Sequence, residues 1–249
     1  MSRHRFYIPP DQWSPESPAL EGDEAKHCTQ VLRLGEGARI TVFNGAGAEA
    51  TAEIVSAERG RVALRVLAAA KAAPLAARLV LAQALPKGKA MDLILQKATE
   101  LGVAEIAPLV SERSVARPAA AEAEAKREKW QRAVIEAAKQ CGQNWLPQVH
   151  APQSVAQFLA RPPAADLALI ASLQPEAVPL KQAIAACRES RGPSPGSATI
   201  LIGPEGDFAP AEINAARAAG YEPVTLGPII LRVETAAVYC LSVLGYELF

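Results

Sequence analysis

The sequence predicts an α/β protein with a small N-terminal β-barrel and a C-terminal domain built on a parallel sheet. Two observations lead to this prediction. Short β-forming runs crowd the chain before Pro74, and strand-like and helix-like segments alternate after it. The chain has 249 residues, which is enough for two ordinary domains. We place the boundary in the low-information stretch AAAKAAP, so the predicted domains are 1–73 and 74–249.

The barrel is predicted from three short runs of β-forming residues. ARITVFNG at 38–45 and AEATAEIV at 48–55 are joined through Asn44-Gly45, a pair that favours tight hairpins. RVALRVLAA at 61–69 alternates larger apolar residues with Ala and Arg, as a half-buried strand does. Several short strands this close together are typical of a small barrel.

In the second domain, the period of the apolar residues changes from segment to segment. MDLILQKATELG and KWQRAVIEAAKQCG carry apolar stripes at helical spacing, and the first ends at Gly102, a good C-cap. Strands are predicted at 78–85, 105–110, 166–172, 198–203 and 222–227. This alternation predicts a parallel sheet with helices on both faces.

Charge and cysteine content exclude several classes of protein. Lys and Arg total 26 and so do Asp and Glu, so nucleic acid must be bound by a local patch. Cys28, Cys141, Cys187 and Cys240 are far apart and only three His are present, which predicts reduced thiols and no metal site. The N-terminus lacks a signal-peptide core, and no uncharged apolar run approaches the length of a bilayer span. We therefore expect a cytoplasmic protein that is not bound to a membrane.

Two glycine-rich loops follow predicted strands: IGPEGDF at 202–208 and LGPIILRVETA at 226–236. In open parallel sheets, ligands bind beyond the carboxyl ends of the strands. A phosphate loop would need a Lys followed by Ser or Thr, and Glu205 and Asp207 would repel phosphate. The ligand is therefore expected to be neutral or cationic here, such as an adenosine carrying a sulfonium. Two alternatives remain open: stiff strand-to-helix turns, or a nucleotide enzyme with an unusual phosphate loop.

These loops, with several further stretches, resemble the RsmE family of ribosomal RNA methyltransferases, which belongs to the SPOUT class. The stretches that carry the resemblance are RFY, HCTQVLRLGEG, FNG, KGKAMDLILQKATELGVAEIAPL, SERS, EAAKQCG, LIGPEGDF and LG followed by ILRVETA. The resemblance covers nearly the whole chain. It implies a PUA-like barrel that binds RNA and a SPOUT methyltransferase domain with a trefoil knot.

The resemblance also implies a function and partners. We expect a homodimer that uses S-adenosylmethionine to methylate the N3 position of a uridine in 16S ribosomal RNA. The substrate would be small-subunit ribosomal RNA or the assembled small ribosomal subunit. An alternative from another class is a non-catalytic RNA-binding or ribosome-assembly factor on the same fold.

The cofactor's adenine suits backbone amides flanked by aliphatic side chains. The residues expected to hold the cofactor are Ser172, Leu173, Leu201, Ile202, Gly203, Pro204, Glu205, Gly206, Leu226, Gly227, Ile230, Leu231, Thr235 and Ala236. The alternative is that these residues only pack in the core or form the turns. Glu205 is either a base or a backbone acceptor that holds its own loop, and we favour the second.

Methylation at N3 of uracil requires loss of that nitrogen's proton. We expect Arg232 to stabilise negative charge on the uracil oxygens, and Glu234 to accept the proton or to orient Arg232. The alternative for this pair is a structural ion pair that begins the last helix.

RNA contacts are expected from local basic groups and nearby rings. The candidates are Arg3, Arg5, Tyr7, His27 and Arg33 in the barrel and Lys87, Lys89 and Arg113 in the second domain, with Phe6 as a further stacking candidate. The last helix carries an apolar set, Val238, Leu241, Val243 and Leu244, with Tyr239 and Tyr246 nearby. This set is either monomer core or a homodimer seam.

Three positions depart from the family's usual residues. Asp207 stands where Gly is usual, Val233 where Thr is usual and Gln143 where Arg is common. Because Asp tolerates left-handed backbone less well than Gly, we predict that position 207 does not need a positive φ.

Overall fold

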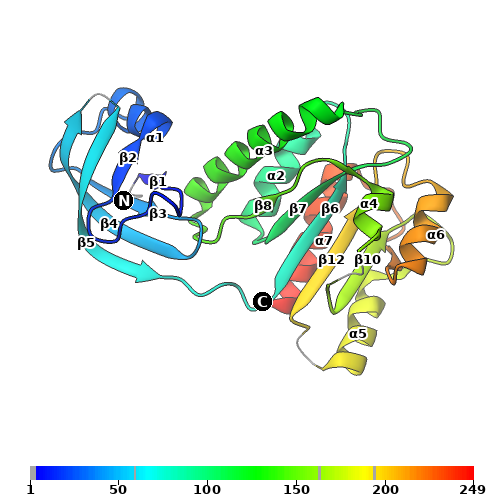
Figure 1. Ribbon diagram of the computed structural model, residues 1–249. Coiled ribbons are helices and arrows are strands. Elements are labelled where there is room, and N and C mark those ends of the chain that lie inside the picture. Colours follow the sequence, from blue (N-terminus) through cyan, green and yellow to red (C-terminus); the bar gives the residue numbers. More distant parts are fainter. Residues whose placement is uncertain (1–3, 59, 162–163, 193–194) are drawn as a thin grey trace. The chain divides into compact units, whose positions relative to one another are not determined.

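The computed structural model describes residues 4–58, 60–161, 164–192 and 195–249 (Figure 1). Contacts between residues divide the chain into two compact units. The first unit comprises Met1–Pro74 and Ile135–Leu146, and the second comprises Leu75–Val134 and Pro147–Phe249. The first unit therefore includes a segment that is distant from it in sequence.

The first unit is built on a five-stranded sheet in the order β1-β3-β4-β5-β2. Its strands are β1 (Arg5–Tyr7), β2 (Ala19–Glu21), β3 (Arg39–Phe43), β4 (Ala48–Glu58) and β5 (Arg61–Lys71). Strand β1 pairs with β3 in parallel, and the other pairs are antiparallel. Helix α1 (Gly22–Lys26) and a π-helical turn (His27–Val31) follow β2. The core includes Phe6, Ile8, Leu20, Ile40, Val42, Ile54 and Val62.

The predicted hairpin is confirmed between β3 and β4. The Asn44 side chain accepts hydrogen bonds from the backbone N–H groups of Ala46 (2.8 Å) and Ala48 (3.0 Å), and Gly45 and Gly47 adopt φ of 71° and 90°. Asn and Gly are favoured in such turns because Asn bonds its own backbone and Gly tolerates positive φ.

The second unit contains an eight-stranded sheet, and the described strand pairs are all parallel, as predicted. The order is β11-β13-β10-β12-β6-β7-β8, and β9 also pairs with β7. The strands are β6 (Arg78–Ala84), β7 (Glu105–Val110), β8 (Gln148–Val149), β9 (Gln153–Ser154), β10 (Leu167–Ala171), β11 (Val178–Pro179), β12 (Ser197–Ile202) and β13 (Glu222–Thr225).

Helices cover both faces of this sheet (Figure 1). Their bounds are α2 (Ala90–Glu100), α3 (Ala120–Cys141), α4 (Val155–Leu159), α5 (Leu180–Arg191), α6 (Pro210–Ala218) and α7 (Val233–Leu248). Helices α2 and α7 pack together, with α7 against β6 and β12, and α4 packs against α6. The predicted C-cap is confirmed, because Gly102 has φ of 77° just after α2. The trefoil knot stays a prediction. None of the described helices is long and apolar enough to cross a membrane.

Candidate functional site

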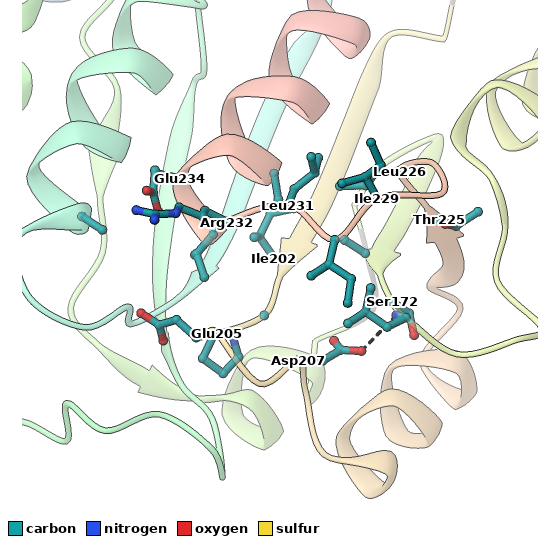
Figure 2. A pocket seen from close by; sticks show the side chains of 18 of the residues that line it. Ser172, Ile202, Glu205, Asp207, Thr225, Leu226, Ile229, Leu231, Arg232 and Glu234 are labelled. Carbon is teal, nitrogen blue, oxygen red and sulfur yellow. Dashed lines mark hydrogen bonds between the residues drawn. The ribbon is translucent and has the colours of Figure 1, made fainter.

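A pocket of about 510 Å³ opens in the second unit where β10, β12 and β13 end (Figure 2). Its lining residues are Lys87, Ala90, Ala171, Ser172, Leu173, Ile202, Gly203, Pro204, Glu205, Asp207, Thr225, Leu226, Gly227, Ile229, Ile230, Leu231, Arg232, Val233, Glu234 and Ala236. Strand ends supply Ala171, Ile202 and Thr225, while the first turn of α7 supplies Val233, Glu234 and Ala236. Both glycine-rich loops therefore meet at one site, as expected for a parallel sheet.

The two acids of the IGPEGDF loop bind backbone N–H groups of other loops. Glu205 Oε1 accepts a hydrogen bond from Lys87 N at 2.8 Å, and Asp207 Oδ2 accepts one from Leu173 N at 3.0 Å. Strand β12 lies between β6 and β10, so its loop is tied to the loop that follows each neighbour. Glu205 thus bonds a backbone N–H, as favoured, although this N–H belongs to the loop after β6 and not to its own.

The prediction that Asp207 does not need a positive φ is wrong. Asp207 lies in the left-handed region, with φ of 62°. Its carboxylate offsets the cost of this conformation, because Oδ1 accepts a hydrogen bond from the N–H of Phe208 at 2.7 Å and Oδ2 binds Leu173 N. Short polar side chains that bond locally are the main exceptions to glycine in this region.

Gly203 and Gly227, which begin the two loops, differ in their surroundings. A Cβ on Gly203 would lie 3.0 Å from Phe208 N and 3.2 Å from Asp207 Cα, so the loop folds tightly back over this residue. Gly227 has φ of 124°, and no described atom outside its immediate chain neighbours would lie within 4 Å of a Cβ there. Gly203 therefore serves the turn, whereas Gly227 leaves its backbone open to a ligand.

The pocket combines exposed aliphatic walls with charges of both signs. Ile229 and Ile230 are each 74% exposed and Leu173 is 60% exposed, so apolar surface faces the opening. Glu205, Asp207 and Glu234 contribute carboxylates, while Lys87 and Arg232 contribute cations. Such a site suits a ligand with a flat apolar ring and a positive charge, and it lacks the Lys-Ser/Thr pair of a phosphate loop.

Arg232 is the N-cap of α7, with extended backbone (φ −65°, ψ 154°) and an exposed side chain. The hydrogen bond from Ala236 N to Arg232 O at 2.8 Å opens the helix, so the preceding N–H groups have no helical acceptor. Within the described structure, no ion pair joins Arg232 to Glu234 or to another carboxylate. The described structure therefore gives no support to a structural ion pair at the start of α7, and the exposed Arg232 side chain belongs to the pocket lining.

Comparison with known proteins assigns the family. Residues 73–245 match the model of an RNA methyltransferase domain, and residues 20–67 match that of an RNA methyltransferase PUA domain. The Ribosomal RNA small subunit methyltransferase E of Bacillus subtilis (strain 168) is 34% identical, with the match covering 92% of this chain and 90% of the relative. The chain belongs to the ribosomal RNA small subunit methyltransferase E family.

Solved structures of similar proteins share this fold. The enzyme of Neisseria gonorrhoeae, bound to S-adenosyl methionine, is 31% identical with a TM-score of 0.85, covering 99% of this chain and 98% of that one. A Legionella pneumophila protein in complex with the cofactor SAM is also 31% identical, with a TM-score of 0.87 over the same shares.

The predicted cofactor residues line the pocket, except Leu201, Gly206 and Thr235. The Leu201 side chain lies in the core between the sheet and α6. Gly206 and Thr235 are exposed outside the lining. Both predicted catalytic residues, Arg232 and Glu234, line the pocket.

Sequence reasoning missed several lining residues as cofactor candidates: Lys87, Ala90, Ala171, Asp207, Thr225, Ile229 and Val233. Most of them adjoin a predicted site residue in sequence, so wider margins around each motif would have found them. Lys87 was expected only as an RNA contact. Its place after β6, two strands from β10, is visible only once the strand order is known.

The RNA candidates of the second unit lie on exposed loops. Lys87 and Lys89 precede α2, and Arg113 follows β7. Arg113 Nη1 donates to the carbonyl oxygen of Gly206 at 2.5 Å, which attaches its loop to the pocket loop while the side chain stays exposed. The structure therefore brings both Lys87 and Arg113 into contact with the IGPEGDF loop.

In the first unit, the candidates have different surroundings. Arg5 donates to Glu49 (2.6 Å) and Asn144 (2.7 Å) and lies over the Phe43 ring, which favours a structural role over the expected RNA contact. The stacking role for Phe6 is wrong, since Phe6 is fully buried. Tyr7 and His27 are half-buried, Arg33 is exposed, and Arg3 lies outside the described residues.

The thiols and carboxylates do not form a metal site in the described part of the chain, where no group of three metal-ligating side chains occurs. All four cysteines are free, as predicted, and Cys141 is the exposed one. Burial raises the pKa of the Cys240 thiol to about 12, so this thiol stays protonated and unreactive at neutral pH.

Proposed function

We propose that this protein transfers a methyl group from S-adenosylmethionine to N3 of a uridine in 16S ribosomal RNA. The observation that carries the proposal is the pocket, in which both glycine-rich loops and the start of α7 converge. Family membership and the S-adenosyl methionine bound by the Neisseria gonorrhoeae relative support the same cofactor.

The residues present fit this cofactor. Leu226, Ile230 and Leu231 offer aliphatic surface to the adenine, and the open backbone at Gly227 allows close approach. The carboxylates of Glu205 and Asp207 suit a ligand with a sulfonium and an ammonium better than one with phosphates. When bound, the cofactor supplies an electrophilic methyl group.

Arg232 and Glu234 supply the groups that the uracil requires. In our proposal, the Arg232 guanidinium donates to a uracil oxygen and stabilises the anion that forms as N3 loses its proton. Glu234 accepts that proton. The absence of an ion pair between these two described side chains favours separate roles over orientation of Arg232 by Glu234.

The RNA partner is proposed to contact the pocket rim through Lys87, Lys89 and Arg113, with the PUA domain as a second contact. We further propose that the substrate is the RNA of the small ribosomal subunit, in the cytoplasm. Lys87, Lys89 and Arg113 are a local group of cations. A chain with equal numbers of acidic and basic side chains needs such a group to bind RNA.

We also propose a homodimer, supported by α7. Leu241 and Leu244 belong to the monomer core, whereas Tyr239 is 45% and Tyr246 is 88% exposed. With the half-buried Val243, these tyrosines form a stripe at helical spacing that a second copy can cover.

Methyl transfer tests the proposed function. Small subunits from cells lacking the modification are incubated with the protein and labelled cofactor, and the RNA is digested to nucleosides for mass spectrometry. We expect about one 3-methyluridine per small subunit. If the cofactor binds but no methyl group is transferred to the RNA, the non-catalytic alternative is favoured.

A further inference from the structure

Asp207 connects the IGPEGDF loop to the segment that follows β10, across one wall of the pocket (Figure 2). It is one of only two described residues other than glycine with positive φ, the other being Arg33. Strained backbone of this kind persists only where the surroundings hold it. Asp207 holds it with both carboxylate oxygens, which accept from Phe208 N and Leu173 N.

The bond to Leu173 completes the backbone hydrogen bonding where β10 ends. Ser172 N donates to Val224 O in β13 at 3.0 Å. Gln174 N donates to the hydroxyl of Ser172 at 3.2 Å. Leu173 N, between them, donates to Asp207, so the carboxylate fixes the peptide that forms this part of the pocket wall.

We propose that Asp207 is a positioning residue that keeps the Ser172–Leu173 wall formed before the cofactor binds. This inference rests on the proposed function. Leu173 is 60% exposed, so water can solvate its N–H when the carboxylate is removed and the fold is retained. Removal of the carboxylate should then weaken cofactor binding, because the cofactor has to order the Ser172–Leu173 wall itself.

Glu212 offers a matched control, because its carboxylate makes the same pair of contacts away from the pocket. Its Oε2 accepts from Ala209 N at 3.0 Å and its Oε1 accepts from Glu112 N at 2.9 Å, a residue on the loop after β7. Glu212 does not line the pocket. Removing this carboxylate disturbs a loop-to-loop contact without touching the pocket wall.

The experiment compares Asp207→Gly, Asp207→Asn and Glu212→Ala with the wild type. Asp207→Gly removes the contact but also the strain at φ 62°, so its melting temperature should stay close to that of the wild type. We expect its KM for S-adenosylmethionine to rise about tenfold with kcat within about twofold, as for one lost hydrogen bond. Asp207→Asn keeps one acceptor, so its KM should lie between that of the wild type and that of Asp207→Gly.

Two further measurements distinguish failure of the positioning role from failure of the proposed function. Hydrogen exchange of the Leu173 amide should speed up in Asp207→Gly without cofactor, and Glu212→Ala should lower the melting temperature but keep the wild-type KM. An unchanged KM in Asp207→Gly, or an equal rise in Glu212→Ala, overturns the positioning role alone. Failure of the wild type to bind the cofactor overturns the proposed function and the positioning role together.

Discussion

At Arg232, the side chain lies in the pocket wall and the backbone begins α7. We expect Arg232→Ala to retain cofactor affinity, because the cofactor should be held mainly by backbone groups and aliphatic walls. Turnover should fall about a hundredfold to a thousandfold, the usual cost of removing one preorganised donor to a developing anion. Methyl transfer and calorimetry measure the two quantities in parallel.

Glu234→Gln is the companion variant for Arg232→Ala. Turnover should fall as strongly if the Glu234 carboxylate takes the N3 proton, and more mildly if it acts in another way. Wild-type turnover by Arg232→Ala would remove Arg232 from the mechanism. Equal losses of affinity and turnover would place it in cofactor binding.

Single substitutions at Glu205 test the role of its carboxylate. Glu205→Gln keeps an oxygen that can accept from Lys87 N but cannot serve as a base, so we expect kcat within about twofold of the wild type. Glu205→Ala loses the contact, and cofactor affinity should fall about threefold to tenfold. A hundredfold drop in kcat for Glu205→Gln would show that this carboxylate is the base after all.

Single residues also mark where sequence reasoning fell short. The identity of Asp207 suggested ordinary backbone, but its conformation depends on Leu173, which is distant in sequence. Leu201 is predicted to line the pocket because it adjoins the loop. Side chains alternate between the two faces of a strand, however, and that of Leu201 points into the core. Which face a residue occupies depends on what packs there, and the local motif does not contain that information.

Among the elements, the glycines that follow α2 and α3 can be compared directly. Gly102 follows α2 and Gly142 follows α3, with φ of 77° and 82°. A Cβ at Gly102 would lie 2.4 Å from Leu75 Cδ1, whereas a Cβ at Gly142 meets no described atom outside its immediate surroundings within 4 Å. We expect both Gly142→Ala and Gly102→Ala to cost about 1 kcal/mol for backbone strain, because Leu75 is 43% exposed and its Cδ1 can move aside. Urea denaturation measures both, and a much larger cost for Gly102→Ala would show that Leu75 cannot move.

The elements of the second unit were largely predictable, because apolar period distinguishes buried strands from amphipathic helices. The strands from β6 to β13 that were predicted occur at their expected places, and α2 has the predicted C-cap. Helix α3 begins at Ala120, well before the predicted start. Its first turns are mostly charged or Ala and show no clear apolar stripe, so the signal on which the prediction depended is missing there.

For the molecule as a whole, sequence order is a poor guide to spatial grouping. Ile135–Leu146 belongs to the first unit although it follows much of the second in sequence. Strand order places β12 between β10 and β6, which brings together loops more than a hundred residues apart. Local periodicity cannot predict either feature, since both depend on contacts between distant segments. The alternation of strand-like and helix-like segments, in contrast, did predict the parallel sheet.

Calorimetry with S-adenosylmethionine, its demethylated product, ATP and NAD tests the central claim most directly. If the pocket of aliphatic walls and carboxylates is an adenosyl-sulfonium site, S-adenosylmethionine should bind and raise the melting temperature, with a stabilisation of about 2.7 kcal/mol at a hundred times its Kd. ATP and NAD should leave the melting curve unchanged, because the three carboxylates of the pocket repel phosphate. Binding of ATP with no response to saturating S-adenosylmethionine would contradict the account.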